Sequence, residues 1–144
     1  MIKIICVGKL KENYLKELVN DYLERLNKYH KTEIIEVKDS DILKEEIAIE
    51  KLINSKDFIV TLEIEGKKMD SKEFSKTIDN WIINNSNIVF VIGGSNGVGS
   101  NIKQRSNFAL SFSDMTFPHG LFRGFLIEQI YRAFKIMNNE SYHK

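Results

Sequence analysis

The sequence predicts an α/β fold in which a parallel sheet is flanked by helices, and three observations lead to this class. Short apolar segments alternate with longer amphipathic segments along the whole chain, which is the pattern of strands alternating with helices. The apolar segments show no alternation of polar and apolar residues, as expected for strands buried on both faces of a sheet. The chain has 144 residues, 42% of them hydrophobic and 28% charged, which suits one globular domain. We therefore expect a single domain over residues 1–144.

The first half of the chain contains three predicted strands and two predicted helices. The first strand ends at Gly8, and the helix predicted for Leu10–Tyr29 carries apolar residues at helical spacing opposite a face of Lys and Glu. A shorter helix is expected over Asp41–Ile53 and a turn over Glu65–Lys68. The strands predicted in this half are Ile2–Val7, Glu33–Val37 and Phe58–Ile64.

The second half continues the alternation and ends in the longest helix. Asp70, followed three residues later by Glu73, resembles a capping box and predicts the start of a helix that runs through Ile83. A short helix is expected near Asn101–Ser106, and the last helix over His119–Asn138. The strands predicted in this half are Asn87–Ile92 and Phe108–Phe112. Ligands of open parallel sheets bind beyond the carboxyl ends of the strands, so function is expected in the segments that follow the strands.

Charge and composition limit the classes of partner. The chain has 21 basic and 20 acidic side chains, which gives a net charge of +1. This charge is low for a protein that binds free nucleic acid through its phosphates. Residues 101–144 hold 6 basic and 3 acidic side chains, so an anionic partner should meet this third of the chain. The single cysteine, Cys6, lies in an apolar run, and the three histidines lack metal-ligand spacing, so no metal site is predicted. No segment resembles a signal peptide or a membrane span, so a cytoplasmic location without membrane contact is expected.

A glycine-rich loop, Gly93–Gly99, follows the fourth predicted strand and precedes a helix. Such a loop allows backbone N–H groups to approach a ligand closely. Its spacing fits neither the P-loop nor the dinucleotide-binding pattern. The loop therefore either binds a ligand or only reverses the chain.

Polar and apolar residues alternate in Ser111–Phe117, immediately after the fifth predicted strand. This segment could offer backbone groups to an adenine edge while its apolar side chains enclose the ring. It could equally be a strand end whose side chains cover the core.

Two further segments carry groups suited to an anionic or nucleotide partner. His119 and Arg123 share one face at the start of the last helix, and a guanidinium matches phosphate geometry. Tyr142, His143 and Lys144 could stack on a base, accept a proton and pair with phosphate. The alternatives are a solvated surface pair and a frayed tail.

These motifs occur together in an order that resembles the RlmH family of ribosomal RNA large-subunit methyltransferases, within the SPOUT class. The resemblance covers nearly the whole chain. The motifs that carry it are Val7–Lys11, Ile34–Val37, Val89–Gly94, Leu110–Ser113, Met115–His119, Glu128–Ala133 and Tyr142–Lys144.

The resemblance implies a SPOUT-type α/β fold with a C-terminal trefoil knot, and a homodimer with its site at the protomer interface. The implied methyl donor is S-adenosylmethionine. The implied acceptor is N3 of pseudouridine 1915 in 23S rRNA on the assembled ribosome. No metal is required for that reaction.

The resemblance also implies roles for individual residues. Catalytic roles are expected for His119, Arg123, Tyr142 and His143, with Arg123 holding phosphate or the developing anion. Gly120 and Gly124 depart from the family, where larger residues are usual, and leave dimer strength open. The donor pocket is expected to comprise Leu62, Gly93, Phe112, Ser113, Asp114, Met115, Thr116 and Phe117.

Two other functions remain open from the residues alone. A Rossmann-like nucleotide-binding enzyme would use the Gly93–Gly99 loop for phosphate, and it predicts binding of NAD or ATP. A non-catalytic flavodoxin-like module would leave the tail Tyr142–Lys144 unexplained.

Overall fold

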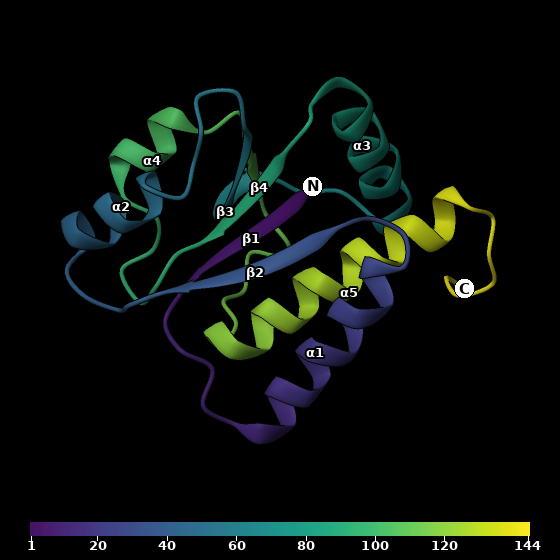
Figure 1. The fold of residues 1–144 in the computed structure, drawn as a ribbon, viewed down its shortest axis with the longest axis horizontal. Coiled ribbons are helices and arrows are strands. Elements are labelled where there is room, and N and C mark those ends of the chain that lie inside the picture. The colour runs from purple at the N-terminus through teal and green to yellow at the C-terminus, as the bar shows by residue number, and fades with distance from the viewer.

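The five strands form one sheet in which each neighbouring pair is parallel, in the order β2-β1-β4-β3-β5 (Figure 1). The computed structural model describes all residues, 1–144. The predicted class, a parallel sheet flanked by helices, is confirmed. The strands are β1 (Ile2–Val7), β2 (Thr32–Val37), β3 (Phe58–Lys67), β4 (Ile88–Ile92) and β5 (Phe108–Leu110). The helices are α1 (Asn13–Asn27), α2 (Ile42–Glu50), α3 (Ser71–Asn84), α4 (Ser100–Arg105) and α5 (His119–Met137).

The helices form two layers, with α1, α3 and α5 on one face of the sheet and α2 and α4 on the other (Figure 1). Successive side chains of a strand point to opposite faces, so β1 divides its residues between the two cores. Ile4 and Cys6 belong to the larger core under α1, α3 and α5. Ile5 and Val7 belong to the smaller core under α2 and α4. The unbroken apolar strands of the sequence follow from this burial on both faces.

The ends of β3 and β5 differ from the prediction. The turn predicted over Glu65–Lys68 is wrong, because β3 continues to Lys67, which pairs with Leu110 after a register shift. A Cβ at Gly66 would lie 2.7 Å from the carbonyl carbon of Ala109, so glycine permits this close pairing. The fifth strand ends at Leu110, two residues earlier than predicted, and the chain leaves the sheet at Ser111.

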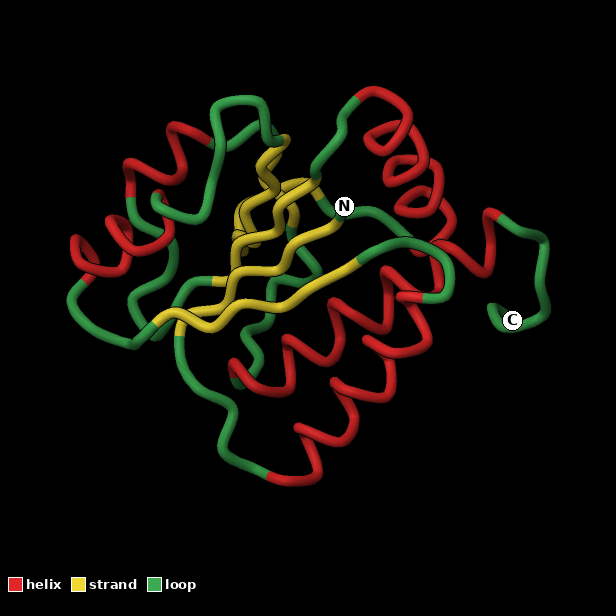
Figure 2. Tube along the Cα trace, in the orientation of Figure 1, coloured by secondary structure: helices red, strands yellow, loops and turns green.

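The helix boundaries lie close to the predicted ones. The carboxylate of Asp70 accepts a hydrogen bond of 2.8 Å from the Glu73 N–H, so Asp70 caps α3 as predicted. Helix α5 begins at His119 and ends at Met137. After it the chain turns back as a short loop, so the C-terminus lies beyond the end of α5 that is remote from His119 (Figure 2).

Candidate functional site

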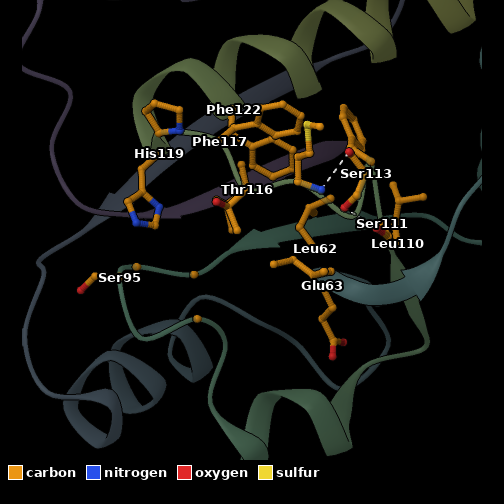
Figure 3. Close-up of a pocket in the computed structure, with 18 residues that line it drawn as sticks. Leu62, Glu63, Ser95, Leu110, Ser111, Ser113, Thr116, Phe117, His119 and Phe122 are labelled. Carbon is orange, nitrogen blue, oxygen red and sulfur yellow. Dashed lines mark hydrogen bonds between the residues drawn. The ribbon is translucent and has the colours of Figure 1, made fainter.

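A cavity of about 540 Å³ lies at the carboxyl ends of β3, β4 and β5 (Figure 3). Residues of β3 and the segments that follow β4 and β5 form most of its wall, and the start of α5 closes one side. Cavities of roughly 300–1,000 Å³ are typical of small-molecule sites. The 18 lining residues are Leu62, Glu63, Ile64, Ile92, Gly93, Gly94, Ser95, Gly97, Leu110, Ser111, Phe112, Ser113, Met115, Thr116, Phe117, Pro118, His119 and Phe122.

The glycine loop reaches the cavity in a tight turn. The Gly97 N–H donates to the Gly94 carbonyl at 2.9 Å, and Gly97 has a φ of +75°, which favours glycine. A Cβ at Gly93 would overlap the backbone of Gly97. The loop's own packing therefore requires glycine at position 93, in addition to any requirement of a ligand.

The start of α4, directly after this loop, is occupied by a carboxylate of the protein itself. Glu46 is almost fully buried, and its Oε2 accepts hydrogen bonds from the N–H groups of Asn101 (2.7 Å) and Ile102 (3.2 Å). A phosphate bound by a loop and helix would need these same N–H groups. The cavity lining also contains no Lys or Arg. Both observations disfavour the phosphate-binding alternative for Gly93–Gly99.

The segment between β5 and α5 forms the aromatic side of the cavity. Ser113 Oγ accepts a hydrogen bond of 3.0 Å from the Met115 N–H, which shapes the turn. The Phe122 ring packs edge-on against Phe112, with ring centroids 5.1 Å apart, and stacks on Phe117 at 5.9 Å. The sequence left open whether this segment covers the core or lines a site, and in the structure its side chains do both.

Seven of the eight residues expected in the donor pocket line this cavity. Asp114 does not, because its exposed carboxylate turns outward and pairs with Lys68. Glu63, Ile64 and Ser95 also line the cavity. Ser95 belongs to the Gly93–Gly99 loop, and Glu63 belongs to the end of the third predicted strand, where function was expected, whereas Ile64 was not predicted. The available signal for Ile64 was its position at the end of the third predicted strand, Phe58–Ile64.

Of the residues expected to be catalytic, His119 lines the cavity and Arg123 does not. Arg123 is only 3% exposed and points into the protein. Its guanidinium donates to Glu36 Oε2 at 2.6 Å and to the Gly8 carbonyl at 3.1 Å. Partial burial raises the pKa of Glu36, but hydrogen bonds from the Leu10 N–H and Arg123 outweigh it, so the pKa lies below its usual value. Arg123 therefore ties the start of α5 to the end of β1, which differs from the solvent-facing position that phosphate contact would need.

Tyr142 and His143 lie near the opposite end of α5. The Tyr142 hydroxyl is 3.0 Å from Glu128 Oε1 and 3.2 Å from the Tyr22 hydroxyl. Arg132 Nη1 lies 3.0 Å from His143 Nδ1. A guanidinium can only donate, so Nδ1 accepts and the proton of the neutral ring sits on Nε2.

The pair Glu128–Arg132 is part of this cluster rather than an isolated ion pair on the helix surface. Arg132 Nη2 donates to Glu128 Oε1 at 2.6 Å, and both side chains are mostly buried. The i,i+4 spacing favours such a pair on a helix, but no sequence signal indicated that the tail would fold onto it.

The structure contains no group of three or more His, Cys, Asp or Glu residues that could hold a metal ion. None of its helices is long and apolar enough to cross a membrane.

Comparison with known proteins gives consistent results. A family model described as "Predicted SPOUT methyltransferase" matches residues 1–143. The chain is 49% identical to the "Putative ribosomal RNA large subunit methyltransferase H" of Methanococcus vannielii, and the match covers 99% of each chain. It is 50% identical to the "Ribosomal RNA large subunit methyltransferase H" of Clostridium botulinum, again over 99% of each chain.

Two solved structures share the fold at 8% sequence identity. A probable methylase family protein from Haemophilus influenzae has a TM-score of 0.61, and the match covers 96% of this chain and 66% of that one. The SpoU methyltransferase AviRb from Streptomyces viridochromogenes has a TM-score of 0.53, with coverage of 98% and 62%. The family model and the two relatives span essentially the whole chain, and the protein therefore belongs to the SPOUT methyltransferase family.

Proposed function

We propose that the protein transfers a methyl group from S-adenosylmethionine to N3 of pseudouridine 1915 in 23S rRNA, on the assembled ribosome in the cytoplasm. The observation that carries the proposal is a cavity at the carboxyl ends of the strands whose lining has no Lys or Arg, in a chain about half identical to relatives named for large-subunit rRNA methylation. The trefoil knot of the SPOUT fold stays a prediction for this chain.

The chemistry of the cavity fits the donor. Its sulfonium carries a positive charge, and the lining contains one carboxylate, Glu63, and no Lys or Arg. Leu62, Ile64, Met115 and Phe117 offer apolar surface to an adenine ring, and the backbone of Ser111–Phe117 offers N–H and C=O groups to its edge. The bound donor supplies an activated methyl group, so the protein has to orient the acceptor nitrogen and handle its proton.

We assign that task to His119 at the cavity and to the tail residues Tyr142 and His143. The Tyr142 ring can stack on a nucleobase. His143 carries an Nε2–H that can donate to a base carbonyl, and it can take a proton only at Nδ1, which Arg132 holds. Arg123 acts by fixing the start of α5, and with it His119.

These residues cannot meet within one protomer as folded. His119 and Arg132, the partner of His143, are 13 residues apart on one helix, which corresponds to about 20 Å. We propose that a second copy brings its tail to the cavity, so that the homodimer completes each site. Tyr14, Leu18 and Phe125 on α1 and α5 leave apolar surface exposed, with Tyr14 69% exposed, and they supply the seam between the copies.

Mass spectrometry of large-subunit rRNA from cells lacking this protein tests the function. We expect one nucleotide, pseudouridine 1915, to lose the mass of a methyl group, and the wild-type chain to restore it. An rRNA that keeps all its methyl groups would contradict the proposal.

Calorimetry with the purified protein tests the donor separately. S-adenosylmethionine is expected to bind, whereas NAD and ATP are not, because the cavity has no cation for their phosphates and Glu46 fills the start of α4. Binding of NAD alone would favour the nucleotide-binding alternative.

A further inference from the structure

The last five residues of the chain, Glu140–Lys144, make an unusual number of contacts for a terminus. Terminal residues are commonly disordered unless side chains tie them down. Here Glu140, Tyr142 and His143 each bind side chains of the folded domain. The contacts come in two groups, one at the root of the tail and one around Tyr142.

The backbone reverses direction at the root. Asn139 has a φ of +54°, in the left-handed region that ends many helices. Its N–H donates to the Ile136 carbonyl at 3.1 Å, and the Glu140 N–H donates to the Lys135 carbonyl at 2.9 Å. The tail therefore runs back along α5 instead of continuing its direction.

Glu140 ties this turn to two other segments through separate oxygens. The Tyr29 hydroxyl, from the loop after α1, donates to Oε1 at 2.8 Å. Lys135 Nζ, from α5, donates to Oε2 at 3.1 Å. The Lys135 ammonium also lies 5.4 Å from the centroid of the Tyr29 ring. We call Tyr29, Lys135 and Glu140 the tail anchor.

Glu140 and Lys135 each have a pKa shifted away from neutral pH by their contacts in the anchor. Hydrogen bonds from Tyr29 and Lys135 hold the pKa of Glu140 below its usual value. The Tyr29 hydroxyl and Glu140 raise the pKa of Lys135. Both groups are therefore ionised throughout the neutral range, and the anchor persists across it.

Beyond the anchor, Tyr142 docks in a fixed orientation. Its ring packs edge-on against Tyr131 with centroids 5.0 Å apart, and the Arg132 guanidinium lies 4.9 Å from its ring centroid. Partial burial and hydrogen bonds with Tyr22 and Glu128 raise its pKa, so the hydroxyl stays protonated and donates to Glu128.

We propose that Tyr29, Lys135 and Glu140 are positioning residues that hold the tail in its active direction before RNA binds. The proposal rests on the proposed function, in which Tyr142 and His143 act at the base. A single exposed ion pair adds little stability, so we expect these residues to orient the tail and not to stabilise the fold. A displacement of about 1 Å between reacting groups can lower the rate a hundredfold. A tail that is already ordered keeps Tyr142 and His143 in place and avoids that loss.

The test uses Glu140→Gln and Tyr29→Phe in the full-length chain, each removing one contact of the anchor. Hydrogen exchange of the Asn139 and Glu140 amides, which donate to carbonyls of α5, should accelerate about tenfold, because the closed state of the tail is less populated. Turnover on ribosomes lacking the methyl group should fall about tenfold in kcat, with KM for ribosomes and donor Kd changed by less than about twofold. A merely structural role would lower thermal stability without this selective loss in kcat.

Two control chains make the outcomes distinct. Lys44→Gln removes an exposed Lys–Asp pair on α2, on the opposite face of the sheet, and should alter neither tail exchange nor kcat. In a chain that ends at Ser141, Glu140→Gln should not lower the residual turnover any further, since no tail remains to be positioned.

Three results would overturn the proposal. If the chain ending at Ser141 methylates at the normal rate, the tail has no part in the proposed function, and the anchor has no role in it. If that chain is inactive while Glu140→Gln leaves tail exchange and kcat unchanged, only the positioning role is refuted. If Glu140→Gln lowers kcat equally with and without the tail, Glu140 acts through some other group.

Discussion

At the residue scale, Arg123 and Glu36 show how a charge near the site is tolerated in the interior. Arg123 is almost fully buried, whereas the Glu36 side chain keeps 39% of its surface exposed. Glu36 Oε2 accepts from both Arg123 and the Leu10 N–H, so one carboxylate joins β2, the loop after β1 and α5. The pair is therefore expected to stabilise the fold around the start of α5.

Arg123→Met should destabilise the protein by about 3 kcal/mol, because it leaves a partly buried carboxylate without its partner. Urea denaturation measures the loss. The double variant Arg123→Met with Glu36→Gln should recover part of it, since no unpaired charge remains. Normal stability with turnover abolished would instead indicate that Arg123 contacts the substrate.

Glu36 also gives the fold a defined pH dependence. Its pKa is lowered in the folded protein, so its contribution to stability is present above the unfolded-state pKa and is lost as the pH falls through the folded value. We expect the free energy of unfolding to decline as the pH falls below 4.5, the ordinary pKa of a glutamate, and to decline less in Glu36→Gln. Equal slopes for the two proteins in urea titrations would show that Glu36 is not responsible.

At the element scale, two glycines allow α1 and α5 to pack closely. A Cβ at Gly120 would lie 2.9 Å from Leu15 Cδ1 and 3.0 Å from Leu10 Cδ1, and both leucines are buried. A Cβ at Gly124 would lie 3.1 Å from Leu18 Cδ2, the end of a partly exposed side chain that can move. Glycine at these two positions, where the family usually has larger residues, therefore lets α5 pack closely against its neighbours within one protomer.

Alanine substitution should separate the two glycines. Gly124→Ala should raise stability by about 0.5–1 kcal/mol, since alanine is the better helix former and Leu18 can shift. Gly120→Ala, in the first turn against buried leucines, should give no gain or a loss. Thermal melts at one fixed protein concentration measure both, and a gain at both positions would contradict the packing argument.

The sequence predicted all ten elements, and most of them have a clear apolar period or run. It could not predict where β3 and β5 end. Residues Glu65–Lys67 are polar or glycine, and only pairing with the distant Leu110 extends the strand through them. Local pattern carries no information about a partner more than 40 residues away, so this boundary depends on tertiary structure.

The candidate site was predictable to a different extent in its two parts. The cavity follows from strand ends, which meet at one edge of a parallel sheet. The cluster around the tail does not, because the contact between Tyr22 and Tyr142 joins residues 120 positions apart. The inward turn of Arg123 toward Glu36 was equally invisible, since its helical spacing with His119 suggested a shared outer face.

At the scale of the whole molecule, α5 separates the two parts of the proposed site. Its first residue lines the cavity, and its far end carries the cluster of Glu128, Arg132, Tyr142 and His143. The tail is tied to α1 by Tyr22, to the loop after α1 by Tyr29 and to α5 by Lys135, so it cannot swing to its own cavity without breaking these contacts. In the homodimer proposed above, a second copy related by twofold symmetry would supply the missing part to each site.

Mixed dimers test this arrangement directly. One chain lacks Tyr142–Lys144, and the other carries Leu62→Trp, which fills the donor cavity, as loss of donor binding in calorimetry should verify. Each is expected to be inactive alone. After equal amounts are unfolded and refolded together, about half of the dimers are mixed, and each has one intact cavity facing one intact tail. Methylation should then return to about a quarter of the wild-type rate, whereas a site built within one protomer would give no recovery, because neither chain has both parts.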